Sequence, residues 1–141
     1  MADAPPFHLA FPVDDLVAAE AFYAGVLGCP IGRRDASWID FDFFGHQIVA
    51  HHAATAVDGP TNPVDGEDVP VSHFGVVVDG ATFDRLAAKL EGALGPDGFL
   101  IPPTLRHEGE PGEQRTFFVR DPAGNALEFK TMRDPDALFS A

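Results

Sequence analysis

Two histidines and one glutamate stand at places in the sequence where their side chains can act together. His8 and His73 each occupy the second position of a predicted strand, 65 residues apart, and Glu128 lies in a third predicted strand. Neutral imidazole and carboxylate groups suit Fe, Mn, Ni or Zn, and three protein ligands leave positions open for a substrate or O₂. The three residues therefore predict a metal site if the fold brings them onto one face.

Strand alternation predicts such a common face. Residues 7–13 and 72–78 alternate so that each histidine lies opposite the bulkier apolar side chains. Residues 125–131 alternate in the same way, with Glu128 opposite its apolar neighbours. We expect the bulky sets to pack against helices, so that both imidazoles and the carboxylate lie on the face opposite the helices.

The elements that position these residues occur twice along the chain. The first half predicts a strand over residues 7–13, a helix over 16–28 and two strands within 37–52 around a turn at Phe44-Gly45. The second half predicts a strand over 72–78, a helix over 81–94, a strand within 98–109 and a hairpin over 114–131. This internal repeat predicts an α+β fold with a first module over residues 1–55, a Pro-, Gly- and Asp-rich linker over 56–71, and a second module over 72–141.

Composition excludes several classes of partner. The chain has 141 residues, enough for one compact domain, with a net charge of −13 that opposes nucleic acids and anionic membranes as partners. Cys29 is the single cysteine, which excludes an intrachain disulfide and fits a reducing compartment. Neither a long apolar run nor a secretory signal is evident. We therefore expect a cytoplasmic protein that acts on a small molecule.

Three stretches carry a family resemblance: FHLAFPVDDLVAAEAFYAGVLG (7–28), SHFGVVV (72–78) and FFVRDPAGNALEF (117–129). With the repeat, they resemble the vicinal oxygen chelate superfamily, which includes glyoxalases, extradiol dioxygenases, fosfomycin-modifying enzymes and bleomycin-binding proteins. The resemblance implies two βαβββ modules that form a half-open mixed β-barrel around a divalent metal, with the helices outside. It also implies that His8, His73 and Glu128 are metal ligands. We further expect a homodimer.

The fourth ligand position distinguishes members of the family. Matching Gly45 to Gly124 places Val49 where the second module has Glu128, and valine cannot bind a metal. By resemblance, two histidines and one glutamate with the fourth position empty are the ligands of extradiol ring-cleaving dioxygenases. The predicted function is therefore cleavage of a catechol-like substrate with O₂, with Fe(II) favoured and Mn(II), Ni(II) or Zn(II) as alternatives.

Two other functions remain open. Gln47 and His51 share the face of Val49, and either one would complete the four-ligand site of a Ni- or Zn-dependent isomerase or lyase. The third possibility is a metal-free protein that binds a small molecule or drug. The acidic charge suits a cationic drug, whereas the predicted ligand set does not.

Further residues are candidates for the chemistry and the pocket. His51 and His107 are the candidate acid/base residues, because the reaction needs a group to move the catechol protons. The predicted pocket residues are Gln47, Val49, Arg115 and Phe117, joined by the aromatic side chains Trp38, Phe41 and Phe43. Arg106 and Arg115 flank a charged, glycine-containing loop and are candidates to meet an anionic group of the substrate.

Overall fold

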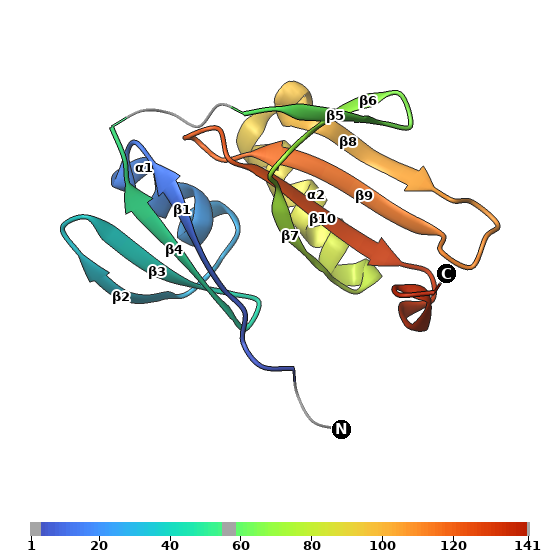
Figure 1. Cartoon of the computed structure of the whole chain (residues 1–141), viewed down its shortest axis with the longest axis horizontal. Helices are drawn as coiled ribbons and strands as arrows, with labels where there is room; N and C mark the ends of the chain where they lie inside the picture. Colours follow the sequence, from blue (N-terminus) through green and yellow to red (C-terminus); the bar gives the residue numbers. More distant parts are fainter. Residues whose placement is uncertain (1–3, 55–58, 141) are drawn as a thin grey trace. The chain divides into compact units, whose positions relative to one another are not determined.

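The computed structural model describes residues 4–54 and 59–140. The chain divides into two compact units (Figure 1). The first contains Met1–Asp58 together with Asp121–Asn125, and the second contains Gly59–Arg120 together with Ala126–Ala141. Each unit is built on its own four-stranded sheet.

The first unit is a βαβββ module. Its elements are β1 (His8–Val13), α1 (Leu16–Glu20), the π-helical turn η1 (Ala21–Val26), β2 (Ile31–Asp35), β3 (Trp38–Phe43) and β4 (His46–His52). The sheet order is β1-β4-β3-β2, with β1 parallel to β4 and the other pairs antiparallel. Phe44 and Gly45 both have positive φ between β3 and β4, which confirms the predicted turn.

The helix of this unit begins at the predicted residue, Leu16, and ends at Val26, two residues before the predicted end. Asp15 caps it, because its carboxylate accepts hydrogen bonds from the backbone N–H groups of Val17 and Ala18. Gly28 follows it with a φ of 77°. The second half of the helix is π-helical, which the apolar spacing did not predict. Phe22 and Tyr23 in that half are buried against the sheet face that carries Phe11 and Phe41.

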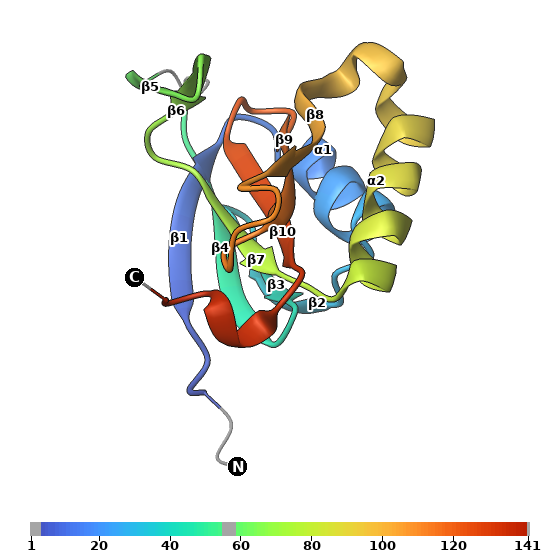
Figure 2. The same ribbon diagram turned by 90° about the vertical axis from the view of Figure 1, so that its right-hand side faces the viewer.

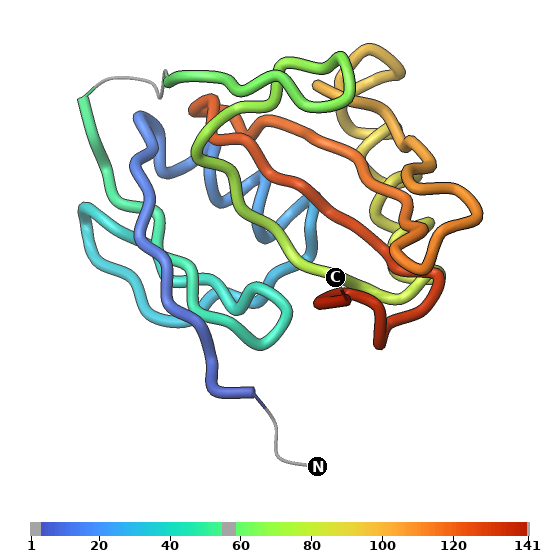
Figure 3. Tube along the Cα trace, turned by 45° about the vertical axis from the view of Figure 1, so that its right-hand side comes forward, coloured from blue at the N-terminus to red at the C-terminus, as the bar shows by residue number. Residues whose placement is uncertain are grey.

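The second unit repeats the arrangement with a longer helix. Its elements are β7 (Phe74–Val77), α2 (Gly80–Leu94), η2 (Pro96–Gly98), β8 (Phe99–Arg106), β9 (Gln114–Arg120), β10 (Ala126–Met132) and η3 (Pro135–Ala137). The sheet order is β7-β10-β9-β8, and the trace in Figure 3 shows β10 between β7 and β9. The α+β class and the two βαβββ modules are thus confirmed.

One face of the second sheet is covered by α2 (Figure 2). The buried side chains of the helix are Phe83, Leu86 and Leu90. They meet the alternate residues of β9 and β10 that include Phe117, whose ring lies 5.1 Å from that of Phe83 and 5.3 Å from that of Phe129. The apolar periodicity of helix and strands therefore fixes which face is left for the predicted histidine and glutamate.

The segment predicted as a linker is partly folded. Residues 55–58 lie outside the described residues, but Thr61–Val64 (β5) and Glu67–Pro70 (β6) form a hairpin in the second unit. Asp65 and Gly66 make its turn with positive φ, and Val69 packs against Ile101 and Phe118. The sequence suggested a linker because turn residues dominate the segment, whereas Val69 and Pro70 are buried and Val64 packs against the same apolar cluster.

The loop Asp121–Asn125 belongs with the first unit, although it joins β9 to β10. The Tyr23 hydroxyl donates a hydrogen bond of 2.8 Å to the Asp121 carboxylate, and the Asn125 amide donates to the Pro12 carbonyl oxygen at 2.8 Å. Asp121 also accepts from the backbone N–H groups of Ala123 and Asn125. The DPAGN stretch is thus a hydrogen-bonded structure and not only a strand connection.

Candidate metal and substrate site

His73 and Glu128 lie together on the face of the second sheet opposite α2. His73 directly precedes β7 and Glu128 is the third residue of β10. The distance from His73 Nε2 to Glu128 Oε1 is 3.4 Å, and the glutamate side chain is only 12% exposed. Two of the three predicted ligands are therefore neighbours within one unit.

The approach of β7 to β10 depends on Gly75, which pairs with Glu128. A Cβ atom at position 75 would collide with the carbonyl oxygen of Glu128. The backbone of β10 therefore fills the space that a side chain at position 75 would need.

The backbone sets the proton position on His73. Its Nδ1 lies 2.7 Å from the carbonyl oxygen of Pro70, and because a carbonyl oxygen can only accept, Nδ1 must carry a proton. A neutral His73 then directs the lone pair of Nε2 at the Glu128 carboxylate. Two acceptors 3.4 Å apart repel each other unless a proton or a metal cation lies between them. This donor set therefore fits a divalent cation.

A hollow of about 220 Å³ opens beside this pair. It is lined by Val64, Val69, His73, Arg106, His107, Gln114, Phe118, Glu128 and Lys130. The Phe118 ring meets the His73 ring edge-on at 5.0 Å, and Arg106 is paired with Asp65, whose pKa it lowers through a hydrogen bond and its charge. The hollow combines apolar walls from the hairpin with cationic and imidazole groups.

The first unit holds His8 in a chain of polar contacts. His8 Nδ1 lies 2.8 Å from Gln47 Oε1, and Gln47 Nε2 donates to the Asp40 carboxylate at 3.2 Å. Asp40 also faces the Arg33 guanidinium at 3.7 Å. Because the carboxylate can only accept, the amide must turn its oxygen to His8, which therefore carries its proton on Nδ1. Nε2 of His8 is left for another partner, as in His73.

The strand registers bear on the fourth ligand position. Ala10 pairs with Val49 in the first unit and Gly75 pairs with Glu128 in the second. Val49 thus holds the place that corresponds to Glu128, and it is buried. The Gln47 side chain is hydrogen-bonded to His8 and Asp40. His51, two residues after Val49 on the same face of β4, is exposed.

Other predicted site residues lie in different surroundings. His107 lines the hollow, with a φ of 56° and Glu110 at 3.7 Å. Phe117 is fully buried against α2, so its predicted place in the pocket was wrong, and Phe118 is the ring that lines the hollow. The predicted pocket positions of two aromatic residues in the first module were also wrong, because Phe41 and Phe43 are buried on the helix side of β3. Trp38 lies on the opposite face of the same strand.

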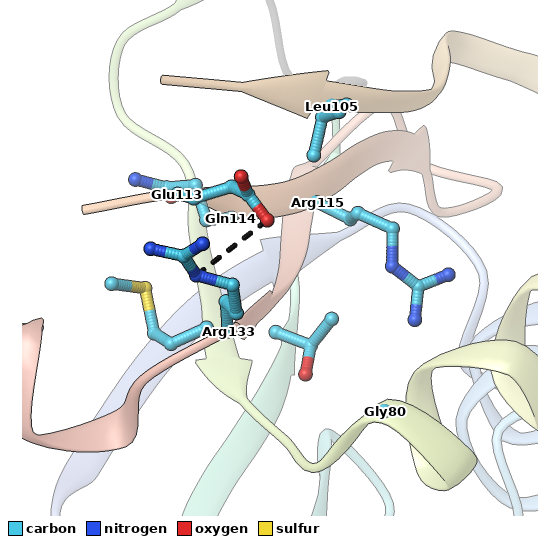
Figure 4. Close-up of a pocket in the computed structure, with 8 residues that line it drawn as sticks. Gly80, Leu105, Glu113, Gln114, Arg115 and Arg133 are labelled. Atoms are coloured by element: carbon cyan, nitrogen blue, oxygen red, sulfur yellow. Dashed lines mark ion pairs between the residues drawn. The ribbon is translucent and has the colours of Figure 1, made fainter. Parts of the chain in front are cut away.

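Arg115 was also predicted to line the pocket, but strand alternation places its side chain on the other face of the sheet. It alternates with Gln114 and therefore lies on the α2 side of β9, where it contacts Asp84 at 2.8 Å and lies over the Phe83 ring. There it lines a separate pocket of about 270 Å³, in which Arg133 pairs with Glu113 (Figure 4). Arg115 is therefore not part of the hollow that contains His73 and Glu128.

Sequence reasoning missed three groups that shape the site. Asp40 and Lys130 could have been found, because each alternates onto the face opposite the helices; Lys130 Nζ lies 3.8 Å from Glu128 Oε1. The carbonyl group of Pro70 left no signal in the sequence. Within residues 4–54 and 59–140, no three His, Cys, Asp or Glu side chains gather as a metal-ion cluster, and His8 and the His73–Glu128 pair belong to different units.

Comparison with known proteins identifies the family. The model of the Glyoxalase/Bleomycin resistance protein/Dioxygenase superfamily matches residues 6–129. The chain belongs to this superfamily. A member from Alicyclobacillus acidocaldarius, described as a glyoxalase/bleomycin resistance protein/dioxygenase, is 34% identical, with a TM-score of 0.78 and 96% of each chain covered. No curated protein matches the chain significantly.

Two further structures of the superfamily fold show how widely it is shared. A lactoylglutathione lyase from Agrobacterium tumefaciens is 21% identical, with a TM-score of 0.58 and coverage of 93% of this chain and 96% of that one. A fosfomycin resistance protein from Mesorhizobium loti is 19% identical, with a TM-score of 0.66 and coverage of 98% and 99%. Among the described residues, no helix is long and apolar enough to cross a membrane.

Proposed function

We propose that this protein is a metal-dependent enzyme whose substrate presents two neighbouring oxygen atoms, and specifically a ring-cleaving dioxygenase for a catechol-like diol. The observation that carries the proposal is the His73–Glu128 pair, with Nδ1 of the histidine held by Pro70 and Nε2 directed at the carboxylate. Such an arrangement supports a cation site because a divalent cation between the imidazole and the carboxylate would bind to both groups. His8 is the third proposed ligand.

The division of roles follows from the donor set. Two imidazoles and one carboxylate are the protein ligands typical of non-haem Fe(II) oxygenases. When bound, Fe(II) supplies the means to hold a diol and O₂ in contact and to pass electron density between them. Val49 at the place that corresponds to Glu128 supports three protein ligands over four.

The remaining residues of the hollow serve the substrate. His107 is the proposed acid/base group for the phenolic protons, because its imidazole lines the same hollow as His73 and Glu128. Phe118 and Val69 provide an apolar wall suited to an aromatic ring. His51 is the second acid/base candidate, from the first unit. We also propose a homodimer, for which sedimentation should give twice the chain mass of 15.1 kDa.

Anaerobic reconstitution with Fe(II) tests the proposal directly. The purified protein should retain about one iron per metal site, and a panel of catechols should give coloured ring-fission products with matching O₂ uptake. His73→Ala and Glu128→Ala should each lose the metal and the activity. His52→Ala is the matched control. His52 is an exposed histidine of β4 outside the proposed site, so its substitution should leave metal content and activity unchanged.

Two outcomes would contradict the proposal at different levels. Unchanged metal content in the His73→Ala and Glu128→Ala variants would reject the site and favour a metal-free binding protein. Metal retention without turnover of any catechol would reject the dioxygenase. Turnover of a thiol-conjugated or 2-oxoacid substrate with Ni(II) or Zn(II), lost on replacing Gln47 or His51, would identify the isomerase or lyase.

A further inference from the structure

Lys130 and Arg106 are the charged residues of the hollow that the proposed chemistry does not use, and Arg106 is already paired with Asp65. Lys130 shares the sheet face of Glu128, two residues further along β10, and Nζ lies 3.8 Å from Glu128 Oε1. Its side chain is 29% exposed and lines both hollows that reach His73 and Glu128, of about 220 and 240 Å³. A lysine at this place is unusual in a chain that has only nine basic residues and a net charge of −13.

A metal on Glu128 would change the partner of Lys130. Without a metal, the same carboxylate oxygen, Glu128 Oε1, lies close to both His73 Nε2 and Lys130 Nζ. A divalent cation on Glu128 neutralises the carboxylate and repels the ammonium group, which then needs another anionic partner. The other charged groups that line the hollow are Arg106, His107, His73 and Glu128 itself, so none of them offers Lys130 a second carboxylate.

A buried hydroxyl lies directly across from this lysine. Lys130 pairs with Thr116 in the β9–β10 register, so both side chains lie on the same face. Thr116 is 1% exposed, and among the described residues its Oγ1 is the buried side-chain polar atom without a hydrogen-bond partner. Its alternate neighbours Gln114 and Phe118 both line the hollow. A hydroxyl donor is therefore buried on the sheet face that carries Lys130, between two residues that line the hollow.

We infer that the substrate carries an oxyanion, such as a carboxylate, beside its two neighbouring oxygen atoms, and that Lys130 selects it. The Lys130 ammonium leaves Glu128 when the metal binds and pairs with the oxyanion. The same movement uncovers the Thr116 hydroxyl as a second donor to that group. This inference rests on the proposed metal site and names the substrate class that the site accepts.

The test uses the full-length protein loaded with Zn(II), which binds diols without turnover. Catechol and 3,4-dihydroxybenzoate, which differ by one carboxylate, are titrated by calorimetry. The unaltered protein should bind the carboxylate about tenfold or more tightly than catechol, as expected for a hydrogen bond to a charged group. Lys130→Met should abolish that preference and Thr116→Val should weaken it, whereas Lys130→Arg should keep it. Lys89→Met, at an exposed lysine of α2, is the matched control.

Metal affinity gives a second measurement that does not depend on a substrate. Lys130→Met removes the cation that competes for Glu128, so the Kd for Zn(II) should fall about two- to fivefold, whereas Lys89→Met should not change it. Failure of the unaltered protein to bind Zn(II) through His73 and Glu128 would overturn the metal site and this inference together. Normal Zn(II) binding with the same carboxylate preference in Lys130→Met would overturn the role of Lys130 alone.

Discussion

Each of the two histidines has one ring nitrogen occupied, by the Pro70 carbonyl for His73 and by the Gln47 amide for His8. In both cases the proton lies on Nδ1 and Nε2 remains for another partner. Such outer contacts orient an imidazole and raise its basicity, as the proposed role of a metal ligand requires. The chemistry of each histidine therefore depends on a neighbour outside the proposed ligand set.

Tyr23 shows a second effect at this scale, on stability. Burial first, and then the charge and hydrogen bond of Asp121, raise the pKa of Tyr23 well above its ordinary value of 10.0. Above about pH 10 the unfolded chain loses the phenolic proton while the folded chain keeps it. The folded state then binds more protons than the unfolded state, so the free energy of unfolding falls as pH rises.

Tyr23→Phe tests this assignment. At pH 7 the variant should lose about 1–2 kcal/mol of unfolding free energy, because Asp121 loses one hydrogen-bond donor. Between about pH 9 and about pH 11 it should lose less stability than the unaltered protein, since the shifted group is gone. Urea unfolding at several pH values measures both effects. Parallel pH profiles of the two proteins would show that Tyr23 is not the group responsible.

At the scale of elements, the pairing of β7 with β10 decides whether His73 and Glu128 meet. Gly75 lets the two strands approach, and α2 covers the opposite face through Phe83, Leu86 and Leu90. The hairpin β5–β6 adds a wall of the hollow through Val64 and Val69. The pocket therefore depends on packing between elements that lie far apart in the sequence.

Gly75→Ala should push β10 away from β7. The added Cβ would meet the Glu128 carbonyl oxygen, which is backbone and cannot turn aside. We expect a loss of about 1–3 kcal/mol in unfolding free energy, together with weaker Zn(II) binding. Gly92→Ala is the matched control: Gly92 lies in α2 with no atom within 4 Å of the added Cβ, so this change should stabilise by about 0.5–1 kcal/mol. Equal effects of the two substitutions on stability would contradict the proposed strand contact.

The charge of the whole molecule acts on its stability and on its choice of ligands. Acidic residues number 22 against nine basic ones. Such an excess repels itself in the compact state, and salt screens the repulsion over distances of about 10 Å at 0.1 M. Arg106 and Lys130 in the hollow are therefore cations on an otherwise acidic protein. This placement favours a role for them in binding an anionic ligand.

Salt should accordingly stabilise the protein. Raising NaCl from about 20 mM to about 500 mM should increase Tm, because screening relieves the repulsion between like charges more than it weakens the scattered surface ion pairs. Thermal unfolding followed by circular dichroism measures the change. A Tm that falls with salt would mean that ion pairs such as Arg115–Asp84 outweigh the net repulsion.

Alternation and repetition in the sequence were sufficient to predict both modules, the turn at Phe44-Gly45 and the faces of His8, His73 and Glu128, because these features depend on local periodicity. Phe117 and Arg115 were predicted in the pocket without use of the strand alternation, and both lie on the α2 side of β9. The folded hairpin within 59–71 escaped prediction because its stability comes from Val69 packing on distant Ile101 and Phe118.

What only the tertiary structure decided is which atoms face each other. The register of β10 against β7 and β9 brings Lys130 and Thr116 together and sets His73 against Glu128. The contacts of Pro70, Gln47 and Asp40 then fix which nitrogen of each imidazole is free. Residue types and spacing determine the kinds of groups that the site offers. Contacts between residues distant in the sequence determine their protonation and neighbours, and a one-dimensional pattern does not contain them.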